Sequence, residues 1–261
     1  MKTKNLVRRL QHGFSLIEMM IVVAIMGIVS AGILSQMDTA QQRNYSEQVK
    51  LDNFQEARDF VDQFFRDINQ IGYPNSRLVD ATSLLWVPVL APQTTYLWAS
   101  PYINDNRLAI GLVSIDNNAV QFEGDMKGNG VVQSILYKKN GSGSCNLCLQ
   151  RSQVDKVYAT DPLGQSLDWG TEANDVLSDP IFTYYKADGT PISTLSLPID
   201  YTTSLKAQTL ASVKTIKISL RIRNNGVLDP STHQALETNF EGEVSINNCS
   251  MATTGRPESC Q

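Results

Sequence analysis

A single carboxylate, Glu18, interrupts an otherwise apolar run of 21 residues from Phe14 to Leu34. An ionised side chain within a membrane-length apolar helix costs roughly a few kcal/mol or more unless a cation neutralises it. Intramembrane carboxylates therefore mark functional sites, and Glu18 predicts a positively charged partner. The chemistry expected of this residue is ion pairing.

The four cysteines form two local pairs in the sequence. Cys145 and Cys148 lie in GSGSCNLCLQ, and Cys249 and Cys260 lie in NNCSMATTGRPESC. In an oxidising compartment four cysteines allow three disulfide pairings, and proximity favours pairing within each local pair. A four-cysteine zinc site fits poorly, because ten residues separate the second pair. A thioredoxin-type redox motif would lie at the start of a helix, whereas the Cys145 and Cys148 pair follows a Gly-Ser loop.

The turn FEGDMKGNG is a candidate for calcium binding, because Glu123, Asp125 and Asn129 offer oxygen ligands among flexible glycines. It departs from the EF-hand pattern, since Lys127 takes an alternate position and no glutamate closes the loop. A turn between two strands accounts for the same residues, so we expect no bound metal.

Catalytic groups are scarce in this chain. Its two histidines are His12, near the N-terminus, and His233, in a polar segment without a nucleophile motif beside it. No glycine-rich phosphate motif opens a helix. We therefore expect no enzymatic activity, no cofactor and no small-molecule substrate. The net charge of −4 also argues against a broad nucleic-acid surface.

The apolar run is long enough to cross the roughly 30 Å hydrocarbon core of a membrane as a helix. The thirteen residues before it are basic and contain no acid, with Lys2, Lys4, Arg8 and Arg9. Such a flank stays on the cytoplasmic side, so the rest of the chain is expected to be exported. A plain secretory signal fits less well, because its apolar region spans only about 7 to 15 residues.

The sequence GFSLIE at residues 13–18, between a basic leader and an unbroken apolar helix, resembles the class III signal of type IV prepilins and type II secretion pseudopilins. The resemblance implies that a prepilin peptidase removes residues 1–13, cutting between Gly13 and Phe14, and N-methylates Phe14. Glu18 would then neutralise the Phe14 amine of a neighbouring subunit and fix the axial register of docking.

The same resemblance implies the partners and the location. The partners are the prepilin peptidase, the inner membrane, and other major and minor pilins that bind through the N-terminal helix. The protein would be a single-pass inner-membrane subunit with a periplasmic domain, and afterwards part of a pilus at the cell surface. Without the basic leader, 18 basic side chains face 26 acidic ones.

Residues 14–34 are expected to form the membrane or filament-core helix, and residues 35–73 its amphipathic continuation. Apolar residues recur in the second part at helical spacing: Phe54, Ala57, Val61, Phe64, Ile68 and Ile71. This stripe predicts packing on the protein's own domain. Gly72, followed by Tyr73 and Pro74, predicts the end of the helix.

Residues 75–261 are expected to form an exported, β-rich domain. Turn-bounded apolar runs predict strands at 84–90, 108–115, 119–123, 131–138, 180–186, 214–223 and 239–247. TIKISLRIR and FEGEVSI alternate apolar and polar residues and predict an antiparallel pair with opposite charges on the wet face. The fold class is therefore α+β and pilin-like, a long N-terminal helix packed on antiparallel sheets.

Three segments resemble the PilW-type minor pilins and, for the first of them, the GspJ-type minor pseudopilins. They are FQEARDFVDQFFRDINQIGYPN at 54–75, AVQFEGDMKGNGVVQSILYKK at 119–139 and FTYYKADGTP at 182–191. The resemblance implies a minor pilin that primes pilus assembly or occupies the filament tip, with adhesion as a further role. A GspJ-like pseudopilin is the alternative, and a membrane-anchored periplasmic binding domain on an uncleaved anchor is a second one. A disulfide between Cys249 and Cys260 would match the C-terminal loop of many pilins.

Overall fold

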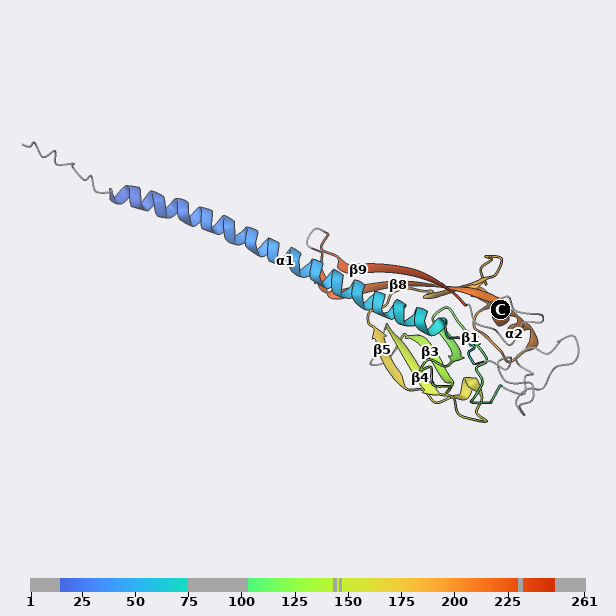
Figure 1. Cartoon of the computed structure of the whole chain (residues 1–261). Helices are drawn as coiled ribbons and strands as arrows, with labels where there is room; N and C mark the ends of the chain where they lie inside the picture. The colour runs from blue at the N-terminus through green and yellow to red at the C-terminus, as the bar shows by residue number, and fades with distance from the viewer. Residues whose placement is uncertain (1–14, 75–102, 143–144, 146, 230–231, 247–261) are drawn as a thin grey trace, which may run out of the picture.

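The computed structural model describes residues 15–74, 103–142, 145, 147–229 and 232–246. Within these ranges one long N-terminal helix is followed by two antiparallel sheets, and the helix packs on both (Figure 1). The expected α+β class is therefore confirmed. The strand expected at 84–90 lies outside the described residues, as do Gly13, Phe14, Cys249 and Cys260.

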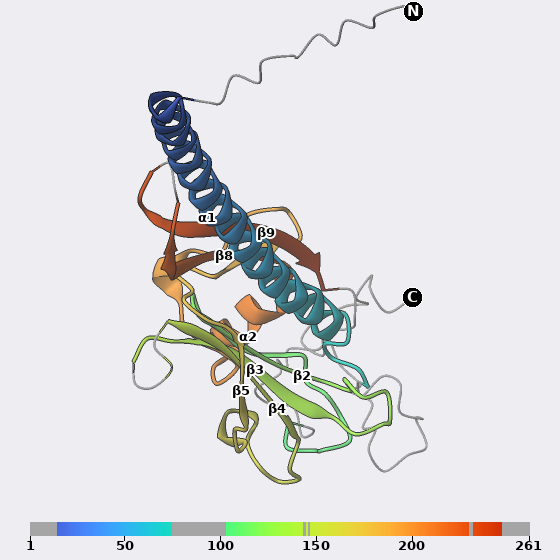
Figure 2. The same ribbon diagram turned by 90° about the vertical axis from the view of Figure 1, so that its left-hand side faces the viewer.

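The long helix α1 (Leu16–Ile68) has 53 residues and is therefore roughly 80 Å long. Its first half projects beyond both sheets, and its second half lies along them (Figures 1 and 2). The helix ends at Ile68, before the expected end at residues 72–73. The Ile71 N–H bonds to Ile68 at 3.2 Å in a tighter turn, and the Gly72 N–H turns to the carbonyl of Glu123 at 2.9 Å. Gly72 adopts the left-handed conformation, with φ of 75°, that lets the chain leave the helix.

The larger sheet has six strands in the order β5-β4-β3-β2-β1-β7. Its neighbouring strands are all antiparallel. The strands are β1 (Leu112–Ile115), β2 (Ala119–Gly124), β3 (Gln133–Asn140), β4 (Cys148–Asp155), β5 (Trp169–Ala173) and β7 (Ile199–Asp200).

The smaller sheet has three strands in the order β6-β8-β9. They are β6 (Phe182–Lys186), β8 (Val213–Leu228) and β9 (Ala235–Ser245). Short helices complete the described elements: η2 (Pro162–Gly164), η3 (Thr194–Ser196) and α2 (Ser204–Ala211).

The predicted pairing of TIKISLRIR with FEGEVSI is confirmed as the antiparallel pair β8 and β9. The alternating isoleucines and leucine of β8 are buried, as expected: Ile216, Ile218, Leu220 and Ile222. On the wet face Lys217 pairs with Glu241 at 2.8 Å and Arg223 with Glu237 at 2.6 Å. Exposed pairs of this kind contribute under about 1 kcal/mol each, so burial stabilises this hairpin more than charge does.

The second half of α1 packs as the apolar stripe predicts, with one exception. Ala57, Val61, Phe64 and Ile68 are all buried, and Phe64 stacks on Phe182 of β6 with ring centroids 5.5 Å apart. Phe54 differs from the prediction, because it remains 43% exposed.

Gly242 of β9 lets the helix approach the sheet closely. A Cβ atom at this position would lie 2.8 Å from the Phe65 ring and 3.2 Å from Val61. Both distances are shorter than ordinary van der Waals contact, so only glycine allows α1 to lie this close to β9.

Candidate functional site

The projecting half of α1, residues 15–45, is exposed at every position, and Ser46 is the first buried residue of the helix. Every large apolar side chain from Leu16 to Met37 is exposed. Among the described helices, only α1 is long and apolar enough to cross a membrane. An uncovered apolar surface of this length requires lipid or other apolar helices around it.

Glu18 lies in the first turn of α1, where Ser15 is the N-cap residue. The Ser15 backbone N–H donates a hydrogen bond of 2.9 Å to Glu18 Oε2. This contact satisfies one of the free N–H groups at the helix start and holds the carboxylate towards the N-terminus, where the helix dipole favours a negative charge. The carboxylate therefore lies beside the backbone nitrogen of Ser15, the first residue that the structure describes. Gly13 and Phe14 themselves lie outside the described residues.

A buried ion pair joins the second half of α1 to the larger sheet. Asp67 Oδ2 lies 2.7 Å from an Arg151 guanidinium nitrogen and accepts a 2.7 Å hydrogen bond from the Tyr137 hydroxyl. The Gln63 side chain donates to the other carboxylate oxygen at 2.7 Å. Burial raises the pKa of Tyr137 well above its ordinary value, which keeps the phenol protonated as the donor. No local sequence pattern predicts this cluster around Asp67 as a whole.

A second buried pair lies where the residues that follow α1 pair with β2, at Ile71 and Gly124. Lys156 Nζ donates to Glu123 Oε2 at 2.7 Å and to the Leu108 carbonyl at 3.0 Å, and both charged side chains are fully buried. The Ile110 N–H donates to the same carboxylate oxygen at 3.1 Å. Burial raises the pKa of Glu123 to about 7, while the charge of Lys156 opposes the rise. Because the Glu123 carbonyl accepts from Gly72, the pair anchors the strand that ends the helix.

The residues named as calcium candidates have other contacts in the structure. Glu123 points into the core towards Lys156. Asp125 accepts hydrogen bonds from the backbone of Asn129 at 3.1 Å and of Gly130 at 2.6 Å. These bonds shape the turn between β2 and β3, as the alternative interpretation expects. In the part of the chain that the structure describes, no three His, Cys, Asp or Glu side chains gather as metal ligands.

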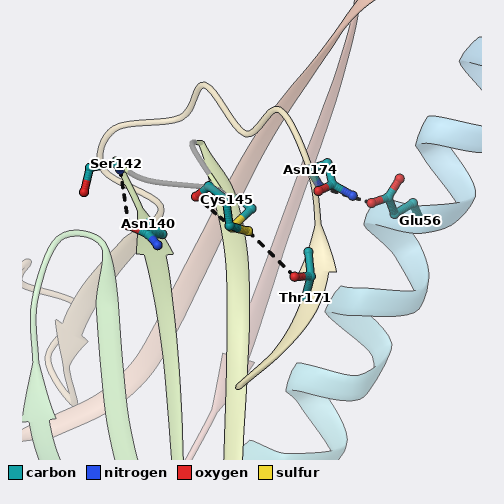
Figure 3. The surroundings of a disulfide bond; sticks show 7 residues. Glu56, Asn140, Ser142, Cys145, Thr171 and Asn174 are labelled. Carbon is teal, nitrogen blue, oxygen red and sulfur yellow. Dashed lines mark hydrogen bonds between the residues drawn. A yellow bond between two sulfur atoms is a disulfide. The ribbon is translucent and has the colours of Figure 1, made fainter. Parts of the chain in front are cut away.

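Cys145 and Cys148 form a disulfide at the start of β4 (Figure 3). The Cys145 sulfur lies 3.7 Å from the Thr171 hydroxyl of β5. Three residues after Thr171, the Asn174 N–H donates to Glu56 of α1 at 3.1 Å (Figure 3). The disulfide therefore closes a short loop of residues 145–148 that leads into β4, near the place where β5 meets the helix. His233 lies at the tip of the hairpin between β8 and β9, with a φ of 54°.

The comparison with family models identifies the same part of the chain as the exposed apolar surface of α1 does. The family model described as the prokaryotic N-terminal methylation motif matches residues 8–34. No curated protein and no solved structure matches the chain. The matched residues cover the end of the basic leader, Glu18 and the apolar part of the projecting half of α1. The chain thus carries, at residues 8–34, the N-terminal methylation signal of type IV pilins and pseudopilins.

Proposed function

We propose that this protein is a PilW-like minor pilin that primes assembly of a type IV pilus or occupies the filament tip, where it also serves adhesion. The observation that carries the proposal is the projecting half of α1, whose apolar side chains have no cover from the described residues. The methylation signal lies on the same residues. A helix of this kind can be held by lipid before assembly and by other pilin helices afterwards.

Processing prepares the helix for this exchange. The prepilin peptidase cuts between Gly13 and Phe14 and methylates the new amine of Phe14. In a core that excludes water, a charged amine needs a carboxylate, and Glu18 of a neighbouring subunit supplies it. A subunit in the wrong axial register would leave both charges buried and unpaired. Glu18 is therefore the docking residue of the proposal.

The length of the chain and two PilW-like segments of the domain support a minor rather than a major pilin. Removal of the leader leaves 248 of the 261 residues, more than major pilins usually have. The PilW-like segment at residues 119–139 forms β2 and β3. The PilW-like segment at residues 182–191 forms β6 and the Asp-Gly turn that follows it. The domain itself, residues 75–261 in the proposal, is the part that would lie in the periplasm and later on the filament.

A GspJ-like minor pseudopilin of a type II secretion system is the second candidate, because the methylation signal is common to both classes. Deletion of the gene in its native host separates them. The minor-pilin proposal expects fewer surface pili, unchanged export of type II substrates, and the protein in the sheared pilus fraction. Lost secretion with normal piliation would establish the pseudopilin instead. Normal piliation together with normal secretion would contradict both.

A further inference from the structure

We propose, resting on the proposed function, that Leu51, Phe54 and Phe240 form a docking patch for the apolar helix segment of a neighbouring pilin-type subunit. A pilin-type subunit here means a chain that carries the same N-terminal methylation motif. The three residues are called the Leu51 patch. They lie in the part of the protein that packs on itself, outside residues 8–34, which the methylation motif covers.

The Leu51 patch is apolar surface that the described chain leaves open. Leu51 is 67% exposed and Phe54 is 43% exposed, and their spacing of three residues places them on one side of α1. The Phe54 ring lies 5.6 Å from the Phe240 ring, tilted by 55°. Phe240 belongs to β9, which pairs with β8 on one side and, among the described strands, with none on the other. The patch therefore lies at the outer edge of the smaller sheet.

The Leu51 patch continues a face of the projecting half of α1. Val22, Met26, Val29 and Ile33 recur at spacings of three and four residues, and all are about half exposed or more. Leu51 follows Ile33 by 18 residues, which is about five turns at 3.6 residues per turn. The two residues therefore lie on the same side of the helix. A partner that packs on the upstream face is directed along the helix towards Leu51.

The geometry of parallel helices identifies the partner. Subunits anchored in one membrane by the same N-terminal segment point the same way, and packed helices keep their axes about 8–10 Å apart. Eighteen residues of helix span roughly 27 Å. A neighbour advanced by that distance brings the end of its own apolar run beside Leu51. It is a different neighbour from the one whose Phe14 amine meets Glu18, because Phe14 and Glu18 are only four positions apart in the sequence. A neighbour in exact axial alignment would instead bring its polar half there.

The charges around the patch agree with an apolar occupant. Lys50 pairs with Glu47 at 3.2 Å on one side, and Arg58 pairs with Asp62 at 3.7 Å on the other. Lys50 also lies 3.5 Å from Asp229 Oδ2, so carboxylates offset both cations near Leu51 and this surface does not attract an anion. An apolar helix of a pilin-type subunit fits the exposed Leu51 and Phe54 side chains better than an anionic ligand does.

Photo-crosslinking in the native host tests the proposal. The full chain carries p-benzoyl-phenylalanine at position 51, and illuminated filaments are sheared, digested and analysed by mass spectrometry. We expect a cross-link to a chain with the methylation motif, within its N-terminal apolar segment. The same probe at Leu195, which is 95% exposed on another part of the domain, should give no such cross-link.

A second variant separates docking from folding. Leu51→Asp should lower the amount of the protein in sheared filaments roughly tenfold, whereas Leu195→Asp should change it less than about twofold. Both variants should keep the wild-type unfolding temperature and a processed N-terminus, because neither side chain is buried.

Cross-linking to lipid, to a protein without the motif, or to the globular part of a neighbour would overturn the proposal, as would normal assembly of Leu51→Asp. These failures differ from failure of the minor-pilin proposal. If the wild-type protein is present in filaments and the probe at Leu51 finds no helix, only the docking patch is refuted. If the wild-type protein never enters a filament, the proposed function itself is wrong.

Discussion

Glu18 contributes to the helix in the free subunit through its hydrogen bond from the Ser15 N–H, and the docking proposal gives the same carboxylate a second role. Both roles place its negative charge at the start of α1. Replacement of Glu18 therefore separates processing, which depends on the leader, from assembly, which depends on the charge.

We predict that Glu18→Ala is cleaved and methylated normally but falls at least about tenfold in the sheared pilus fraction, because one buried amine stays unneutralised. Intact mass and quantitative immunoblotting measure the two effects. Asp59→Ala is the matched control, since Asp59 is an exposed acid on the same helix, outside the Leu51 patch. Wild-type piliation by Glu18→Ala would refute the docking role.

Asp67 gives a prediction about stability. Asp67→Ala leaves Arg151 without its partner in a largely buried position, so we expect a loss of about 3–5 kcal/mol in the free energy of unfolding. Urea unfolding followed by circular dichroism measures it. Asp62→Ala breaks only an exposed pair with Arg58 and should cost less than about 1 kcal/mol. Equal losses in the two variants would contradict the buried network.

Glu123 predicts an unusual pH dependence. Its folded-state pKa of about 7 lies above its ordinary value of 4.5, so its contribution to stability is full below pH 4.5 and is lost as the pH rises through 7. The free energy of unfolding of the wild type minus that of Glu123→Gln should fall by about 2–3 kcal/mol between these pH values. Denaturation at several pH values measures the difference. A flat or rising difference would contradict the raised pKa.

The residues of the site differ in how far the sequence predicts them. Glu18 is predictable, because the two features that indicate its role, the basic leader and the apolar run, are its immediate neighbours in the chain. Asp67 and Arg151 are 84 residues apart, and their pairing depends on β4, a strand too polar to be predicted. A signal did exist, since Asp67 follows Phe60 and Phe64 at helical spacing on the buried side of α1.

The same limit holds for the elements. The sequence predicts β8 and β9, since alternating isoleucines and charges define one buried and one wet face. It misses β4 and β5, where CLQRSQVD and WGTEA show little apolar alternation and become strands by pairing with neighbours. It also misses α2, whose eight residues are too few for a clear helical pattern. Tertiary contacts, rather than local preference, define these elements.

The contact between α1 and β9 leads to a prediction at the scale of elements. Gly242→Val should destabilise the protein by about 1–3 kcal/mol, because the added side chain would overlap Phe65 and Val61 and push the helix away from the sheet. Thermal unfolding measures the loss. Gly141→Ala is the control, since a Cβ there meets nothing within 4 Å. An unchanged unfolding temperature in Gly242→Val would show that α1 does not approach β9 this closely.

At the scale of the whole molecule, the two halves of one helix of roughly 80 Å have different surroundings. Its second half completes the core of the domain and is held by Asp67, Phe64 and the close approach at Gly242. Its projecting half has no partner among the described residues and carries the methylation signal. The contacts that hold α1 on the domain therefore lie outside the projecting half, through which, in our proposal, the subunit assembles.

The N-terminus of the protein in its native host tests this account most directly. Intact-mass analysis of the membrane-extracted protein should show a chain of 248 residues that begins at Phe14 and carries one added methyl group. A chain that still begins at Met1, in cells with an active prepilin peptidase, would contradict the account.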